Sequence, residues 1–522
     1  MASAGEQAPA APAINPWIIA VAVMLSTFME VLDTTVVNVS LPHIAGSLSA
    51  TVDESTWTLT SYLVSNAIIL PITGWLANYF GRKRLLMLSV IGFTTASFLC
   101  GLAPNLGFLV FFRVIQGACG GGLQPISQAV LLESFPPRDR GKAMGFWGLG
   151  IVVAPMLGPV LGGWLTDSYS WRWVFYINVP IGIAAIVMTK LFIFDPPYIR
   201  RTSSRVDYWG IGMLAVGIGA LQVVLDKGQE KDWFGTHWIT ALLLLAAVLL
   251  IAFVIYELMT EHPVVDLRVF KNRSYSTGTF MMAILGVGLY GSTVLIPLVL
   301  QTLLGYPALQ AGIAMAPRGF GSFVAMPVVG MIMTRFDSRK LLALGVGVCA
   351  ITLIQLSQLD LSAGYWQFFW PQIFMGISLG FVFVPLTTVT MDPIPKESMG
   401  NATSLFNLVR NLGGSIGISA VETMQVRREQ VHLGVLGAHV NGLNLGSVQV
   451  LGQLKGYFTS IGSDPVTAAH QAYVALWGMV MRQAAMLSYN DTFRVLGVLF
   501  LLMLPMIFIM RKPKGHGPGM AH

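Results

Sequence analysis

Charged residues are scarce in this chain of 522 residues. Asp, Glu, Lys and Arg make up 11% of it, whereas a soluble protein has about 25%. Hydrophobic residues make up 54% and the mean hydropathy is +0.68. Fourteen membrane-spanning helices of about 20 residues would use about 280 residues, or about half of the chain. The composition therefore predicts an all-α polytopic membrane protein. It excludes a secreted disulfide scaffold, a disordered chain and a nucleic-acid binder.

Cysteine and histidine are also rare, and neither forms a recognisable site. The three cysteines, Cys100, Cys119 and Cys349, each lie in an apolar run without a CxxC pair, which is typical of small core residues. The eight histidines form no HExxH motif. Nucleophile–base constellations, metal-ligand spacings and Walker loops are absent from the sequence as well. We therefore expect no catalytic residues, no metal and no cofactor.

The N-terminal segment lacks the features of a cleaved signal peptide. No Lys or Arg precedes the first apolar run. That run is too long for a signal and reaches Asp33 rather than a small-residue cleavage site. It is predicted to be retained as the first span.

Hydropathy and loop charge predict the topology. If the N-terminus is cytoplasmic, 19 Lys and Arg residues fall on the cytoplasmic side and 7 on the outer side, four of these in segment 425–490. This bias places both termini in the cytoplasm. The net charge of +7 is then explained by loops beside lipid headgroups. The fourteen predicted spans are 17–39, 56–77, 84–103, 107–133, 141–165, 173–194, 207–226, 238–259, 275–303, 308–334, 340–358, 365–391, 400–424 and 491–510.

The chain repeats itself at long range. Residues 74–84 (GWLANYFGRKR) and 330–340 (GMIMTRFDSRK) both have a Gly, a Phe six residues later and a basic cluster. Both copies end on the same side of the membrane, which indicates two parallel six-helix halves, an organisation typical of alternating-access transporters. The predicted division is a cytoplasmic tail (1–16), an N-terminal half (17–194), two linker helices (195–260), a C-terminal half with outer segment 425–490 (261–510) and a cytoplasmic tail (511–522).

Segment 425–490 is too long for a simple turn. Its last part, HQAYVALWGMVMRQAAMLSYN, resembles an amphipathic helix. A docking element for a partner and a solvated or interfacial loop are both consistent with the sequence.

Ionisable residues inside spans are costly, so each is a functional candidate. Glu30 and Asp33 lie three residues apart on one face of span 1. A carboxylate there can be protonated when buried and ionised when water reaches it, which would couple proton flow to conformation. Arg113 in span 4 needs an acceptor, and Asp33 or a backbone carbonyl of span 1 is the natural candidate. A structural ion pair and a water-facing group at the rim are the alternatives, and the sequence does not decide whether Glu30 or Asp33 carries the proton.

Other polar residues within the spans are candidates for the substrate cavity. They are Asn38, Gln116, Gln124, Arg318, Asn407 and Arg410.

Span 5 is unusually rich in glycine and proline. Gly158, Gly162 and Gly163 permit close helix contact, while Pro155 and Pro159 remove backbone donors and bend the helix. This combination favours a helix at a moving interface.

These motifs together resemble the major facilitator superfamily, and more closely its fourteen-span drug:proton antiporter family. The resemblance covers nearly the whole chain outside 425–490 and the tails. The matching segments are 32–42 (LDTTVVNVSLP), 74–84, 113–117 (RVIQG), 158–163 (GPVLGG), 171–180 (WRWVFYINVP) and 226–233 (DKGQEKDW).

The resemblance implies export of hydrophobic, often weakly acidic toxic compounds in exchange for protons, and thus antibiotic resistance. It also implies a Gram-negative inner membrane, a periplasmic membrane-fusion adaptor and an outer-membrane channel. Gly74, Gly81 and Arg82 match the family's cytoplasmic motif, but Asn78 stands where the family usually has Asp. The charge-based latch that this Asp forms is therefore in doubt here.

Two other interpretations remain. A transporter of the same fold could carry one narrow metabolite or lipid-like substrate, and a substrate panel would separate the two. An integral membrane enzyme or a channel is the second rival. The absence of catalytic motifs argues against the enzyme, and the two-half repeat argues against the channel.

Overall fold

The computed structural model describes residues 15–195, 207–261, 263–441 and 443–510. Residues 1–14 of the predicted N-terminal tail, the whole predicted C-terminal tail (511–522) and most of the basic loop before the seventh span lie outside these ranges. The regular structure of the described residues is helical throughout. The N-terminal half contains α1 (Pro16–Ser47), α2 (Val52–Ser55), α3 (Trp57–Phe80), α4 (Arg82–Leu102), α5 (Leu106–Gly120), α6 (Leu123–Ser134), α7 (Arg140–Ser168), α8 (Trp173–Tyr176) and α9 (Asn178–Phe192).

Two linker helices separate the halves in sequence, α10 (Tyr208–Lys227) and α11 (His237–Met259). Short 3-10 turns adjoin α11 and α12. The C-terminal half contains α12 (Arg273–Leu298), a π-helical turn (Val299–Leu303), α13 (Ala308–Ile332), α14 (Ser338–Leu356), α15 (Tyr365–Met391), a 3-10 turn (Lys396–Ser398), α16 (Met399–His439), α17 (Leu445–Ser460), α18 (Pro465–Leu501) and α19 (Met503–Ile507).

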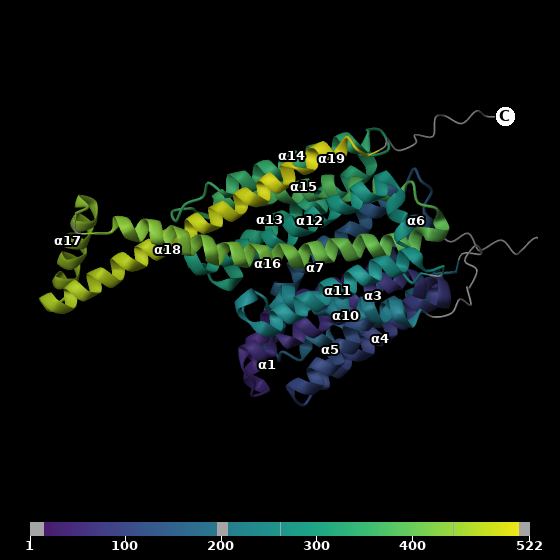
Figure 1. The fold of residues 1–522 in the computed structure, drawn as a ribbon, viewed down its shortest axis with the longest axis horizontal. Helices are drawn as coiled ribbons and strands as arrows, with labels where there is room; N and C mark the ends of the chain where they lie inside the picture. The colour runs from purple at the N-terminus through teal and green to yellow at the C-terminus, as the bar shows by residue number, and fades with distance from the viewer. Residues whose placement is uncertain (1–14, 196–206, 262, 442, 511–522) are drawn as a thin grey trace, which may run out of the picture.

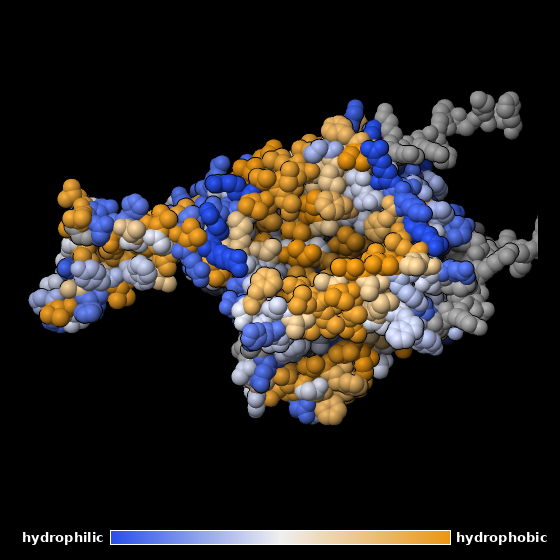
Figure 2. Space-filling view, in the orientation of Figure 1, coloured by the Kyte–Doolittle hydropathy of each residue, from blue (hydrophilic) through white to orange (hydrophobic). Residues whose placement is uncertain are grey.

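The described residues are consistent with the fourteen predicted membrane spans. Among these residues, thirteen helical segments are long and apolar enough to cross a membrane. The predicted span 400–424 lies in α16, whose polar residues Asn407, Arg410 and Asn411 lower its hydropathy. Figure 2 shows a broad apolar surface over the helices, bordered on the right by hydrophilic side chains. We call this border the basic end, because α4, α7, α12 and α14 begin there with Arg82, Arg140, Arg273 and Ser338–Arg339.

The two halves lie side by side, and α10 contacts both (Figure 1). It packs against α3 of the N-terminal half and α16 of the C-terminal half. The Gln222 amide of α10 donates to the Ser415 hydroxyl of α16 over 3.0 Å. In contrast, α11 exposes a stripe of large aliphatic side chains, including Leu244, Val248 and Ile251, as expected of a helix that faces lipid.

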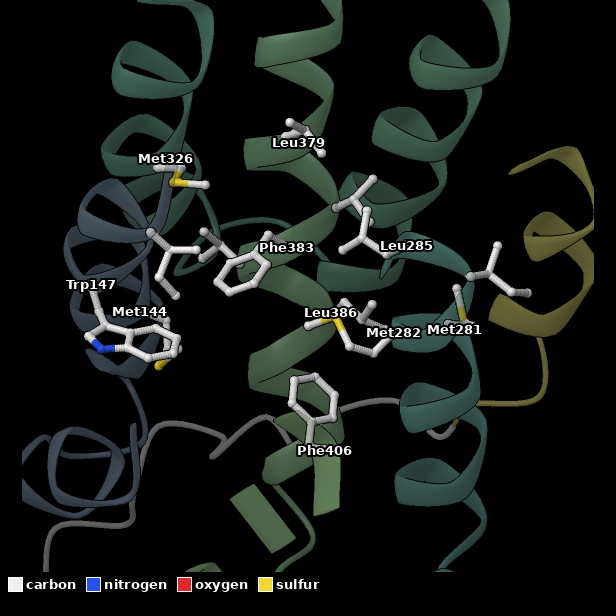
Figure 3. Packing of buried hydrophobic residues seen from close by; sticks show 14 of the residues in the cluster. Met144, Trp147, Met281, Met282, Leu285, Met326, Leu379, Phe383, Leu386 and Phe406 are labelled. Atoms are coloured by element: carbon white, nitrogen blue, oxygen red, sulfur yellow. The ribbon is translucent and has the colours of Figure 1, made fainter. Parts of the chain in front are cut away.

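The backbones of the two halves come into close contact near the basic end. A Cβ added to Gly74 of α3 would lie 2.6 Å from the Cα of Asn401, and one added to Gly145 of α7 would lie 2.6 Å from the carbonyl oxygen of Met326. Real Cβ atoms essentially never come this close. Beside Gly145, Trp147 stacks on Phe383 of the other half, with ring centroids 6.2 Å apart (Figure 3). These contacts hold the two halves together toward the basic end.

The opposite end carries a helical hairpin, in which two helices continue beyond the predicted spans. The predicted span 400–424 continues unbroken as α16 to His439, and the predicted span 491–510 begins as α18 at Pro465. The 41 residues of α16 are about 60 Å long, about twice the thickness of the hydrocarbon core. Hydropathy scores side chains, so it detects only the apolar part of such a helix. The polar part continues with the same backbone hydrogen bonds and is not detected.

The outer parts of α16 and α18 project from the helix bundle, with α17 at their tip (Figure 1). We call residues 425–490 the outer hairpin. The predicted helix at its end is confirmed, since residues 470–490 belong to α18. At the base, the Asp491 carboxylate pairs with Arg428 at 2.5 Å and with His432 at 2.8 Å. These contacts join α16 to α18.

Candidate functional site

Asp33 lies at the centre of a buried polar cluster in the N-terminal half. Its side chain is fully buried, and both carboxylate oxygens accept hydrogen bonds. The Arg113 guanidinium of α5 donates to Oδ2 over 2.5 Å. The side-chain amides of Gln116 and Asn178 donate to Oδ1 over 3.0 and 2.8 Å. The predicted Asp33–Arg113 pair is confirmed, and the cluster joins α1, α5 and α9.

Arg113 is held from several directions. Its Nε donates to the carbonyl of Thr58 over 3.0 Å, and Nη1 also donates to Gln116 over 2.8 Å. The guanidinium lies over the ring of Tyr62, 4.2 Å from its centroid. A buried charge is tolerated when its counter-ion and hydrogen bonds are in place. These contacts fix the guanidinium beside Asp33.

Asn178, Ser97, Tyr62 and Thr58 belong to this cluster but were not predicted from the sequence. Asn178 also donates to the Ser97 hydroxyl over 3.0 Å, which ties α9 to α4. Asn178 could have been predicted from the sequence, because it is the only side-chain amide in the mostly apolar stretch 171–180. Thr58 contributes only its backbone carbonyl, which no side-chain pattern could have indicated.

Glu30 lies one helical turn before Asp33 and has different surroundings. Its side chain is 4% exposed. Oε1 accepts a hydrogen bond from the Asn66 amide of α3 over 3.1 Å. Oε2 has no hydrogen-bond partner among the described residues. The two candidate carboxylates therefore differ. Asp33 is ion-paired and both of its oxygens accept hydrogen bonds, whereas Glu30 has no ion pair and only its Oε1 accepts a hydrogen bond.

Three of the predicted cavity residues meet at the interface between the halves. Arg410 of α16 donates to the Gln124 side chain of α6, and Asn407 donates to Gln128 over 2.6 Å. One turn away, the Thr403 hydroxyl donates to the carbonyl of Pro125 over 3.0 Å. This polar seam connects the two halves inside the bundle.

The other predicted cavity residues lie elsewhere. Gln116 belongs to the Asp33 cluster, and Asn38 is exposed on α1 beyond it. Arg318 is buried in the C-terminal half, where it donates to Thr293 Oγ1 over 3.2 Å and to the carbonyl of Leu289 over 3.4 Å. It is not part of the seam at Gln124.

The glycines of α7 pack against α1. A Cβ on Gly158 would lie 2.1 Å from Thr35 Oγ1, and a Cβ on Gly162 would lie 2.6 Å from the Val36 carbonyl oxygen. A Cβ on Gly163 would have its nearest neighbour at 3.9 Å, so this glycine is not in close contact with α1. The structure therefore assigns the close contact to two of the three predicted glycines. Pro155 and Pro159 lie inside the same helix.

The basic end contains a charged contact that does not depend on residue 78. The buried Arg82 forms an ion pair with Glu133 of α6, and its Nη2 lies 3.5 Å from the carbonyl oxygen of Lys396 in the other half. Gly81 has a φ of +88°, which favours glycine. Asn78 is partly exposed nearby.

Known proteins share this fold and much of this sequence. The Major Facilitator Superfamily model matches residues 23–418. In solved structures, a double-Trp mutant of XylE superposes with a TM-score of 0.61 at 14% identity, covering 96% of this chain and 97% of that one. The human organic anion transporter MFSD10 superposes with a TM-score of 0.60 at 12% identity, covering 95% of this chain and all of that one. At such identities these neighbours show the fold alone.

Sequence relatives are closer. The multidrug export protein EmrB of Escherichia coli K12 is 37% identical over 503 residues, 96% of each chain. EmrB of Haemophilus influenzae is 39% identical over 499 residues, 95% of this chain and 96% of that one. The fatty acid resistance protein FarB of Neisseria gonorrhoeae is 36% identical over 95% of this chain and 96% of that one. The chain belongs to the major facilitator superfamily and is an EmrB-like multidrug efflux transporter.

Proposed function

We propose that this transporter exports hydrophobic toxic compounds by alternating access in exchange for protons, with Asp33 as the coupling carboxylate. The observation that carries the proposal is the buried Asp33–Arg113 pair at the junction of several helices. A group that changes its charge at such a place can change how the helices pack. The proton gradient supplies the energy, so neither a cofactor nor catalytic chemistry is needed.

Protonation of Asp33 would disturb its surroundings directly. Oδ1 already accepts two hydrogen bonds and Oδ2 accepts one, so a proton on Oδ1 must displace a donor and a proton on Oδ2 must sit beside the Arg113 guanidinium. It would also remove the counter-ion of Arg113, and an unpaired buried charge is strongly unfavourable. Proton uptake is therefore expected to loosen α1 from α5 and α9. Proton release restores the packed cluster.

The proposal is tested by drug uptake into inside-out vesicles with and without a proton gradient. Asp33→Asn keeps the shape of the side chain but cannot be ionised. We expect it to lower gradient-driven uptake at least about tenfold, while drug binding changes by less than about threefold, because only a difference between states drives transport. The double variant Asp33→Asn/Asn38→Asp carries a carboxylate elsewhere on α1, so it should not restore gradient-driven uptake and serves as a control for carboxylate position. Uptake that still responds to the gradient in Asp33→Asn would assign coupling to another group.

One relative supports a narrower alternative. FarB is a fatty acid resistance protein, so a single lipid-like substrate class is the second candidate. A panel of structurally unrelated drugs and long-chain fatty acids, assayed in the same vesicles, separates the two. Transport confined to fatty acids would replace the multidrug proposal.

We further propose that the transporter lies in a bacterial inner membrane with both termini in the cytoplasm. The outer hairpin would then project into the periplasm and meet a membrane-fusion adaptor (EmrA-like) that leads to an outer-membrane channel (TolC-like). The support is the hairpin's exposed apolar surface, visible as orange patches at its tip (Figure 2). Leu443, Leu445 and Val474 are 94%, 87% and 71% exposed. Apolar side chains in water favour a protein partner.

Removing the tip of the hairpin tests this arrangement. We expect replacement of residues 441–463 by a short Gly/Ser turn to preserve uptake into inside-out vesicles, because the Asp33 cluster lies in the bundle. Drug resistance of intact cells should fall to the level of cells that lack the transporter. The measurement is the minimum inhibitory concentration beside the vesicle rate for the same variant. Unchanged cell resistance would contradict a role in adaptor docking.

A further inference from the structure

A cavity lies where the outer hairpin meets the outer end of the C-terminal half. Its volume is about 600 Å³, within the range of about 300–1,000 Å³ that is typical of small-molecule sites. Leu361, in the connection between α14 and α15, contributes to the lining. Leu436 and Val440, one helical turn apart on α16, and Val480 of α18 add to it. These side chains give the cavity an apolar lining.

Hydrogen bonds join the hairpin to the bundle around this cavity. The Asn490 amide of α18 donates to the carbonyl of Leu359 over 2.9 Å, two residues before Leu361. The Arg482 guanidinium of α18 donates to the carbonyl of Leu303, beyond the end of α12, over 2.8 Å. A site whose walls are already held in place has a smaller ordering cost when a ligand binds.

Arg482 brings to the cavity a positive charge that no carboxylate balances among the described residues. A guanidinium has five N–H donors, and the bond to the Leu303 carbonyl occupies one of them. Within the described part of the chain, no Asp or Glu lines the cavity. Asp360, beside the lining, accepts from Ser362, and Asp491 is paired at the base of the hairpin. The cavity therefore favours an anion.

The other polar groups of the lining are neutral donors and acceptors. Asn444 accepts from the backbone N–H groups of Gly446 and Ser447 through Oδ1, which leaves its side-chain NH₂ group as a donor. Gln483 also lines the cavity. One guanidinium among neutral amides matches a singly charged carboxylate better than a doubly charged phosphate, and Arg and carboxylate can form two parallel hydrogen bonds.

We propose that this cavity binds amphipathic carboxylates, with Arg482 holding the carboxylate and the apolar lining holding the hydrophobic part. On the proposed topology, the cavity lies on the side to which exported compounds are released. It selects the ionised form of a weak acid, and this form re-enters a bilayer less readily because a charge in an apolar medium is costly. The inference goes beyond the proposed antiport, since binding here needs neither Asp33 nor a proton gradient.

The charge requirement is tested with purified full-length protein in an uncharged detergent. The probes are naphthylacetate and its amide, which have similar shapes but differ in charge. By calorimetry, wild-type protein should bind the carboxylate at least about fivefold more tightly than the amide, a modest preference because solvent screens part of the attraction. Arg482→Gln should remove this preference, whereas Arg482→Lys, which keeps the charge, should retain most of it. Arg427→Gln removes an exposed cation of the same hairpin outside the lining and should change neither affinity.

Cysteine protection locates the binding. Met479→Cys places a thiol in the lining, and Val474→Cys places one on the exposed surface of the same helix outside it. At about ten times its Kd, naphthylacetate should slow maleimide labelling of Met479→Cys at least about threefold and leave Val474→Cys unchanged. Wild-type protein gives the background from the three native cysteines.

Each contrary outcome overturns a stated part of the inference. Equal affinity of wild-type protein for the two probes, or Arg482→Gln that binds like wild type, overturns the role of Arg482. Loss of the preference in Arg427→Gln as well would mean that the overall charge of the hairpin attracts the anion. Labelling of Met479→Cys that naphthylacetate does not slow overturns the site, and protection by a short-chain phosphatidylglycerol alone would assign the cavity to a lipid headgroup. Equal thermal stability of the variants confirms that they are folded, and the antiport proposal is decided separately by the vesicle assay.

Discussion

Arg113→Met is expected to destabilise the folded transporter by about 3–5 kcal/mol, because removing one partner leaves a buried charge uncompensated. Arg113 is fully buried and balances Asp33 at 2.5 Å. Methionine fills a similar volume but carries neither charge nor donor. The loss should appear as a fall in thermal midpoint and in yield of folded protein from detergent extracts.

The double variant Asp33→Asn/Arg113→Met provides the decisive control. With both charges gone, no unpaired ion remains, so much of the lost stability should return. The Asp33→Asn change alone also leaves Arg113 unpaired and should cost stability in its own right. If the double variant recovers stability but loses gradient-driven transport, the two residues act in coupling as well as in folding. If the two single changes simply add, Asp33 and Arg113 are not coupled and the cluster does not work as a unit.

Gly158→Val is expected to abolish most transport through a steric effect on the contact between α1 and α7. Even a single Cβ at this position would lie 2.1 Å from Thr35 Oγ1 and 3.1 Å from the backbone of Thr35. Because the backbone of α1 cannot move aside freely, the helices must separate, at a cost of about 1–3 kcal/mol or more. The separation would also move Asp33, two residues before Thr35. Vesicle uptake and thermal stability measure the two effects.

Gly163→Val is the matched control on the same helix. A Cβ there would be 3.9 Å from its nearest neighbour, Val39 Cγ1, so the substitution should leave transport within about twofold of wild type. Equal damage by both substitutions would mean that β-branching within the membrane helix, rather than the contact with α1, is responsible.

The Asp33 cluster shows how much of the candidate site can be predicted from the sequence. Asp33 and Arg113 are recognisable because ionisable groups within apolar runs are costly and must find partners. The same argument applies to Glu30, but it cannot predict that Glu30 lacks a counter-ion. Whether two such groups meet depends on the packing of helices that are far apart in the chain. Gln116 illustrates this limit, since the structure joins it to Asp33 rather than to the interface between the halves.

The sequence by itself determined the membrane class, the approximate spans and the two-half repeat, because apolar runs and loop charges act locally along the chain. Only the tertiary structure decided which polar groups meet. Gln124 and Arg410 are 286 residues apart, and Asn178 reaches Asp33 across 145 residues. The tertiary structure also decided the length of α16 and α18. A helix that leaves the membrane keeps its backbone hydrogen bonds while its hydropathy falls, so hydropathy alone does not show where it ends. Hydropathy is a property of each side chain by itself, whereas these contacts depend on how the helices pack.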